Sequence, residues 1–343
     1  GVEVYHTAHD DLAHQSPGSL AHLTESAVGT VSALGQTDLR TLAPRQTVWF
    51  DVLGAFVVAW PAAWSLPLAT LGFVGLLTTA LLLVRARRVR PSAIALSFAS
   101  WLGSVLLCLL GGFGLVSWVK APASWIAHPN ALLSLLFGMP LVSSMALAWA
   151  VRDRVSVEAS ALGTALVHAL LAVVLARLLP GASYLLVAPA LVAALSYPLL
   201  VRHPALAVGL PALAGLLASI LVLRTLYPGL GMLVAPAIPV VAALFVLPFA
   251  PLFQLLSQRT RGLAAAGLAV LSLLCAIVAW TRAPFSAEVP RRVNVLHVEE
   301  AGAARAVTVI DPTWVGMPWG DAPREMIAAL GPGAREGSAS PWY

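Results

Sequence analysis

The chain has 343 residues, of which 59% are hydrophobic and only 10% are charged, and its formal net charge is +5. A water-soluble protein needs about a quarter of its residues charged to solvate its surface, so this composition excludes an ordinary soluble enzyme or binding domain. Lipid must therefore replace water around most of the chain. The basic residues lie in short loops between apolar runs, which is typical of membrane proteins, and we expect no nucleic acid partner.

The N-terminal segment, residues 1–46, is too polar to cross a bilayer. Its first residues, Val2–Thr7, read like the end of a strand entering a loop, and a strand needs a sheet. We therefore expect the sequence to be the C-terminal portion of a longer protein. A helix follows, because Ser16 is a favourable N-cap, Pro17 suits the first turn and Gly35 ends it. Apolar side chains fall close to one face of this helix: Leu20, Leu23, Val28, Val31 and Leu34.

Residues 47–65 connect this segment to the apolar region. The run from Val48 to Trp60 contains Asp51 and Gly54 and ends at Pro61, so it is poorly suited to a helix in lipid. We predict an extended, β-rich lead-in at the membrane surface, and a tilted interfacial helix is the alternative.

Residues 66–281 form the predicted membrane domain. A transmembrane helix needs about 20 predominantly apolar residues. Eight stretches qualify: Leu66–Val84, Ile94–Trp118, Ala131–Val151, Ala159–Leu179, Ala182–Val201, Ala205–Leu226, Leu230–Leu256 and Gly262–Trp280. The predicted fold class is therefore an all-α membrane bundle of about eight transmembrane helices.

Prolines are frequent within these stretches, among them Pro211 and Pro248. A proline has no backbone N–H and so frees a carbonyl, and helices in a bundle tolerate this because their neighbours can satisfy the freed group. The seventh stretch is predicted to be kinked or broken because it carries four prolines: Pro236, Pro239, Pro248 and Pro251.

The loops between the stretches differ sharply in charge. Alternate loops carry nine arginines: Arg85, Arg87, Arg88, Arg90, Arg152, Arg154, Arg202, Arg259 and Arg261. The other loops carry only Lys120, with Arg177 and Arg224 at helix ends where their side chains can snorkel. The positive-inside rule then puts the arginine-rich loops in the cytoplasm. With an even number of spans, both termini are extracytoplasmic, in a periplasmic, extracellular or luminal space.

The pattern changes again in residues 282–343. Alternating residues predict two strands, one around Val293–Val298 and one at Ala306–Ile310. Two strands are not stable by themselves, so we expect a β-rich extracytoplasmic segment that is truncated. The tail from Gly331 to Tyr343 is predicted to be a loop.

The start of the chain carries a motif. Tyr5-His6-Thr7-Ala8-His9-Asp10-Asp11-Leu12 is followed by Ser16-Pro17-Gly18-Ser19-Leu20. This resembles the C-terminal motif of the two-zinc aminopeptidases, metallopeptidase family twenty-eight, in which a Tyr-His-Thr-x-x-Asp loop precedes a Ser-Pro-x-x-Leu helix start. The layout, with Val48–Gly54, several spans and an outer C-terminal segment, is similar to the membrane-bound branch that includes the endoplasmic reticulum metallopeptidase.

The resemblance implies that His6 ligates one of two zinc ions and that Tyr5 lies beside the metal, able to hydrogen-bond an oxyanion. Asp10 would fix the geometry of the loop as a partner behind the ligand. Paired zinc ions polarise the scissile carbonyl of a peptide and activate the attacking water. The family's other ligands and its general base lie upstream of this motif and have no match here, so we expect the chain alone not to hydrolyse peptides.

Other readings of these histidines stay open. His6, His9 and Asp10 could form a self-contained metal site, or His6 could be a loop histidine without metal. Three histidines are expected to be solvated: His9, His14 and His22. His168 falls in the middle of a span, where an ionisable residue indicates function by default, but a neutral histidine hydrogen-bonded inside the bundle is the favoured reading.

The leading hypothesis is thus the membrane part of a zinc-dependent, aminopeptidase-like hydrolase. It would anchor an extracytoplasmic peptidase domain in the lipid bilayer and supply one zinc ligand. The alternatives are a multi-pass transporter and a catalytically inactive membrane scaffold. Against transport, the spans contain few charges and we find no internal repeat or pair of broken helices.

Overall fold

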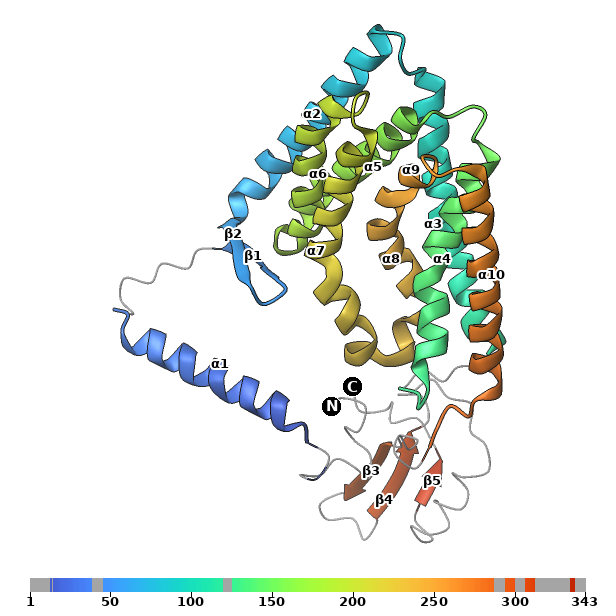
Figure 1. The fold of residues 1–343 in the computed structure, drawn as a ribbon. Coiled ribbons are helices and arrows are strands. Elements are labelled where there is room, and N and C mark those ends of the chain that lie inside the picture. Colours follow the sequence, from blue (N-terminus) through green and yellow to red (C-terminus); the bar gives the residue numbers. More distant parts are fainter. Residues whose placement is uncertain are drawn as a thin grey trace.

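The computed structural model describes residues 13, 15–38, 46–119 and 125–286, and the backbone of three strands at residues 294–299, 306–311 and 334–336. Most of the described residues are helical, and the apolar helices pack into one bundle (Figure 1). An amphipathic helix, a β-hairpin and a small sheet accompany it. The chain is thus a helical bundle of the membrane type, as its composition predicts.

Helix α1 (Pro17–Gly35) begins and ends where the sequence predicts. Ser16 is the N-cap, and its Oγ accepts a hydrogen bond from the backbone N–H of Ser19 at 3.3 Å. Pro17 takes the first helical position, where its missing N–H would have no helical partner in any case. No residue of α1 is buried, and the helix lies apart from the bundle (Figure 1).

A β-hairpin joins the N-terminal segment to the bundle. Strands β1 (Thr47–Val52) and β2 (Phe56–Pro61) pair antiparallel, so the stretch expected to be extended is a hairpin. The hairpin packs on the bundle through aromatic rings, because Phe50 stacks on Tyr184 with 5.0 Å between the ring centroids. Trp60 Nε1 donates to Ser65 Oγ at the start of the first apolar helix, at 3.0 Å.

Seven apolar helices follow the hairpin, in addition to the short helices described below. Their bounds are α2 (Ser65–Arg85), α3 (Pro91–Trp118), α4 (Pro129–Ala150), α5 (Val157–Leu178), α6 (Tyr184–Ser196), α7 (Pro204–Leu230) and α10 (Gln258–Thr281). In the described part of the chain, six helical stretches are long and apolar enough to cross a membrane. Helix α6 is shorter, although a 3₁₀ turn extends it to Leu199. The count of eight spans therefore remains a prediction.

One of the six stretches, Pro204–Phe253, has 50 residues without a loop. A straight helix of that length would measure about 75 Å, more than twice the roughly 30 Å of a bilayer core. The stretch instead reverses at Gly231, which ends α7 with φ 63°. It continues as a 3₁₀ segment (Gly231–Ala237), α8 (Ile238–Val246), a 3₁₀ turn (Leu247–Phe249) and α9 (Ala250–Phe253). Helices α7 and α8 run in opposite directions (Figure 1), and the two 3₁₀ segments confirm the break predicted inside Leu230–Leu256.

Helix α5 forms the centre of the bundle. Twelve of its 22 residues are buried, and most of them are small, whereas α10 at the periphery buries none. Small residues let neighbouring backbones approach closely. At Gly163 an added Cβ would lie 2.6 Å from the Cβ of Ser97 on α3, and Ser97 Oγ donates to the Ser160 carbonyl at 3.0 Å.

A hydrogen bond between α6 and α7 compensates for the backbone donor that Pro211 lacks. Pro211 has no N–H, so the carbonyl of Ala207, four residues earlier, lacks its helical donor. The hydroxyl of Ser196 on α6 donates to that carbonyl at 2.8 Å. The expectation that a neighbouring helix satisfies the freed group is confirmed at this position.

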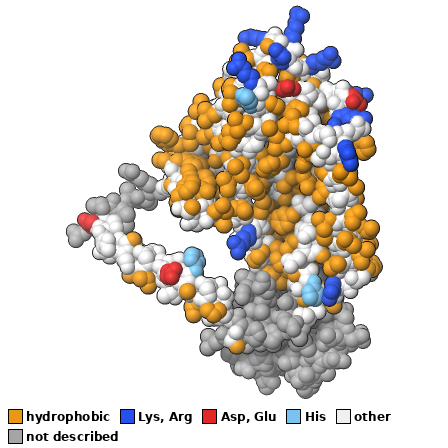
Figure 2. Space-filling model, viewed as in Figure 1, with side chains coloured by type: hydrophobic (Ala, Val, Ile, Leu, Met, Phe, Trp, Pro, Cys, Tyr) orange, Lys and Arg blue, Asp and Glu red, His pale blue; other side chains and the backbone are white. Residues whose placement is uncertain are grey.

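The two ends of the bundle differ in charge. The nine loop arginines gather at one end, the top of Figure 2, and a broad band of hydrophobic side chains lies below them. Arg177, Arg224 and Arg282 lie away from that end. Helix α1 and the C-terminal strands lie toward the opposite end (Figure 1).

The C-terminal strands form a three-stranded sheet. Strands β3 (Asn294–Glu299) and β4 (Ala306–Asp311) pair antiparallel at the predicted positions. The prediction of a loop for the whole tail is wrong, because β5 (Ala334–Glu336) pairs parallel to β4. Ala, Arg and Glu have no preference for strands, and pairing with a distant strand decides the conformation of such short segments.

We expect Gly163→Ala to destabilise the bundle. The added Cβ would lie 2.9 Å from the Ile94 carbonyl and 2.6 Å from Ser97 Oγ, and overpacking of this kind costs about 1–3 kcal/mol. Gly209→Ala on α7 is the control, since its added Cβ would meet nothing within 4 Å. Thermal unfolding of both variants in one detergent measures the difference. An equal fall in Tm for both would contradict the close contact between α3 and α5.

Candidate functional site

The residues predicted from the motif, Tyr5, His6 and Asp10, lie outside the described residues. His9 and His14 also lie outside them, while His22 is exposed on α1, as expected. Within the part of the chain that the structure describes, no three His, Cys, Asp or Glu side chains come close enough together to hold a metal ion. The described candidate site is therefore the polar core of the bundle.

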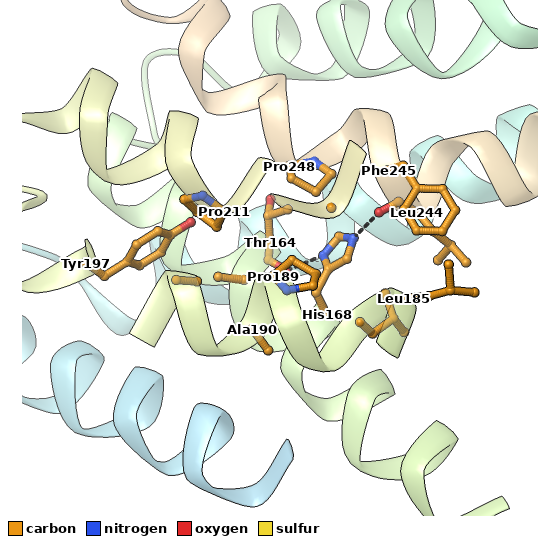
Figure 3. Close-up of a pocket in the computed structure, with 14 residues that line it drawn as sticks. Thr164, His168, Leu185, Pro189, Ala190, Tyr197, Pro211, Leu244, Phe245 and Pro248 are labelled. Atoms are coloured by element: carbon orange, nitrogen blue, oxygen red, sulfur yellow. Dashed lines mark hydrogen bonds between the residues drawn. The ribbon is translucent and has the colours of Figure 1, made fainter. Parts of the chain in front are cut away.

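His168 on α5 lies at the centre of that core and is 94% buried, with an exposed fraction of 6%. Its Nε2 lies 2.7 Å from the carbonyl oxygen of Leu244 on α8, as the dashed line in Figure 3 marks. Pro248, four residues after Leu244, has no N–H to donate to that carbonyl. The imidazole thus supplies the donor that the proline removed, and it ties α5 to the break after α8.

The other ring nitrogen, Nδ1, lies 2.8 Å from the carbonyl oxygen of Thr164 on the preceding turn of α5. A carbonyl oxygen only accepts, so both contacts are satisfied together only when both nitrogens carry hydrogen. A neutral imidazole carries only one N–H and can therefore donate to only one of the two carbonyls. Of the two, the Leu244 carbonyl is the one that lacks a helical donor. The indole of Trp101 meets the ring edge to face at 5.6 Å between centroids, which fixes the ring plane. The prediction that His168 is hydrogen-bonded inside the bundle is confirmed.

A cavity of about 30 Å³ adjoins His168. Three prolines line it, Pro189, Pro211 and Pro248, together with Tyr197 (Figure 3). The hydroxyl of Tyr197 donates to the Ala161 carbonyl at 3.3 Å, so it is already engaged. A cavity of this size holds about one water molecule and no peptide.

A second cavity of about 30 Å³ lies on the other side of Thr164, between α3, α4 and α5. Hydroxyl-bearing residues line much of it: Ser97, Ser100, Ser104, Ser144, Ser160 and Thr164. Trp101 also lines it, and its buried Nε1 has no hydrogen-bond partner among the described residues. Such a cavity is polar enough to hold a bound water.

Sequence reasoning missed this hydroxyl cluster. The available signal was the spacing of Ser97, Ser100 and Ser104, which places three hydroxyls on one face of a helix at intervals of three and four residues. The arrangement can bind water and neutral polar groups. No acidic or basic side chain is among the described residues that line this cavity.

Comparison with known proteins adds no relative: no family model, curated protein or solved structure matches this chain.

We expect His168→Ala to cost about 1–3 kcal/mol of stability, because it leaves the buried Leu244 carbonyl without a donor. The same change should cost clearly less in a Pro248→Ala background, where residue 248 regains its N–H. Thermal unfolding of the single and double variants in detergent measures this coupling. His203→Ala, at an exposed position between α6 and α7, is the control and should be silent. Equal costs in both backgrounds would contradict the pairing of His168 with the proline break.

Proposed function

We propose that this chain is the membrane-embedded part of a zinc-dependent, aminopeptidase-like metallopeptidase. In this proposal the bundle anchors an extracytoplasmic peptidase domain, and the loop before α1 contributes His6 as a zinc ligand. The observation that carries the proposal is the arrangement of the chain about the bundle. Helix α1 and the C-terminal sheet lie toward one end, and the nine loop arginines lie at the other (Figures 1 and 2).

The sidedness supports the proposal through the positive-inside rule. Arginine-rich loops remain in the cytoplasm, so the opposite end, with α1, faces outward. Gln36 caps the end of α1 and Thr47 begins the hairpin, so ten residues separate the helix from a structure that packs on the bundle. A domain that ended at α1 would thus be held within a short distance of the membrane surface.

The helix that follows the motif also supports the peptidase proposal. The motif needs a helix that starts at Ser-Pro, and α1 starts there with Ser16 as its cap. The helix exposes its apolar face, with Leu23 and Val31 both more than 60% exposed. The tail of a larger domain would bury such a face against the rest of that domain.

The zinc chemistry would be shared between this chain and the rest of the peptidase domain. One imidazole holds zinc weakly, because affinity rises with the number and preorganisation of ligands. A two-zinc site needs further carboxylate and imidazole ligands and a general base, and the motif here offers only His6, with Asp10 behind it and Tyr5 beside it. The chain alone is therefore proposed to be inactive.

Solute transport is the second candidate function, and one observation favours it. The Pro204–Phe253 stretch is interrupted at Gly231 and again after α8, and His168 lies against the second break. Interrupted helices surround the binding sites of many transporters. The cavities at this break are about 30 Å³ each, too small for a solute in the described conformation, so we rank this function second.

The orientation can be tested with single cysteines. In a Cys275→Ala background, where Cys108 is fully buried, Gly181→Cys between α5 and α6 should react with an impermeant maleimide in intact bacterial cells. Asp153→Cys, at the arginine end and 89% exposed, should react only after permeabilisation. Labelling of Asp153→Cys in intact cells would reverse the orientation and remove the argument for an outward peptidase domain.

The zinc site can be tested in a longer protein that contains both this chain and the peptidase domain with the other zinc ligands. His6→Ala should release zinc and lower turnover by several orders of magnitude, because it removes both a ligand and Lewis acidity. Tyr5→Phe should keep the zinc and lower turnover roughly a hundred- to a thousandfold, through loss of one oxyanion donor. Zinc content and peptide turnover are measured side by side.

His22→Ala, at an exposed position of α1, is the matched control for these variants and should change neither zinc content nor turnover. Full zinc and normal turnover in His6→Ala would show that the motif is not a zinc site. In that case the transport hypothesis would become the better one.

A further inference from the structure

A cavity much larger than the two near His168 lies between α4 and α10, at the arginine end. Its volume is about 560 Å³, against about 30 Å³ for each cavity near His168. The last three turns of α4 form one wall and the first four turns of α10 form the other. Phe253 and Gln254, at the end of α9, also line the cavity.

The sequence explains why the space is open. Several of the facing residues are small: Ala146 and Ala148 on α4, and Gly262, Ala265 and Ala269 on α10. Helix α10 is held to the bundle at its far end, where Trp280 stacks on Trp118 with 4.7 Å between the ring centroids. No residue of α10 is buried, so this helix lies at the edge of the bundle.

The charged residues that line this cavity lie at one end of it. Arg152 and Arg261 line it there, with Gln254 and Gln258. The Nε of Arg261 is buried and has no hydrogen-bond partner among the described residues. A guanidinium N–H without an acceptor is costly, so an acceptor from outside the chain is the expected partner.

Arg152 is also only weakly neutralised. Its Nε lies 3.6 Å from a carboxylate oxygen of Asp153, whose side chain is 89% exposed, and exposed pairs contribute little. The guanidinium carbon lies 5.8 Å from the centre of the Trp149 ring, which holds the side chain against the cavity wall. The mouth of the cavity therefore keeps a net positive charge.

The depth of the apolar wall identifies the ligand. Ser272, the deepest lining residue on α10, follows Arg261 by eleven residues, or about 16 Å at 1.5 Å per residue. That is about half of a roughly 30 Å bilayer core, the depth of one leaflet. A free phosphate or a soluble peptide would leave this wall, lined by Leu268 and Val142, uncovered.

We propose that this cavity binds one anionic phospholipid from the leaflet at the arginine end. The phosphate accepts hydrogen bonds from Arg261 and Arg152, and an acyl chain lies along the small residues of α4 and α10. Basic pockets between transmembrane helices bind anionic headgroups in this way. The proposal does not depend on which side of the membrane the arginine end faces, nor on the peptidase hypothesis.

The test uses the full chain, purified in a neutral detergent and titrated with dioleoylphosphatidylglycerol or dioleoylphosphatidylcholine, with bound lipid counted by native mass spectrometry. One phosphatidylglycerol should bind saturably and more tightly than phosphatidylcholine. Arg261→Gln should weaken it about fivefold, since each basic residue near the surface contributes about 1 kcal/mol. Ala265→Phe, which fills the cavity and leaves both arginines in place, should reduce binding at least as much.

Arg259→Gln is the matched control, because Arg259 lies on the same turn of α10 and does not line the cavity. Arg261→Lys, which keeps the charge, should retain most of the binding, and Tm without added lipid checks that each variant folds. Equal affinity for both lipids, or equal losses in Arg259→Gln and Arg261→Gln, would mean general attraction and would overturn the proposal. Binding of inorganic phosphate alone, or a dimer that covers the α4–α10 face, would overturn it as well.

Discussion

Backbone carbonyls without donors are the constraint on which this bundle depends, because lipid supplies no hydrogen bonds to replace them. The sequence contains 25 prolines, and each proline inside a helix frees a carbonyl four residues earlier. Two of these carbonyls find donors on neighbouring helices: Ser196 donates to Ala207, and His168 reaches Leu244. A third orphan is the Pro228 carbonyl at the end of α7, which accepts from Trp125 Nε1 at 3.0 Å. Carbonyls that prolines free in one helix thus form hydrogen bonds that link it to a neighbouring helix.

These hydrogen bonds between helices require that the helix backbones approach closely, and small residues allow this approach. The buried face of α5 consists largely of Ala, Ser, Gly and Thr, so α3 can bring Ser97 within hydrogen-bonding distance of the Ser160 carbonyl. The same property has the opposite effect at the periphery. Between α4 and α10 several small residues face each other, and an open cavity results. Packing of small residues yields a tight core in one place and a lipid-sized space in another.

The polar core of the bundle and the N-terminal motif have different roles in the proposed function. His168 and the serine-lined cavity are explained by helix packing and bound water, and their cavities are too small for a peptide. The peptidase proposal rests instead on the motif and on sidedness. In that proposal the bundle has the role of a rigid anchor, which fits a core whose polar side chains tie neighbouring helices through backbone carbonyls.

The sequence by itself determined the membrane class, the positions of the apolar stretches, the capped helix at Ser16 and the concentration of arginines in alternate loops. Each of these follows from local properties: hydrophobicity, capping chemistry and charge. The tertiary structure alone decided that β5 pairs with β4 and that His168 meets the break at Pro248. His168 and Leu244 are 76 residues apart, and no local pattern encodes such a contact. It arises only when packing brings an orphan carbonyl on one helix to a donor on another.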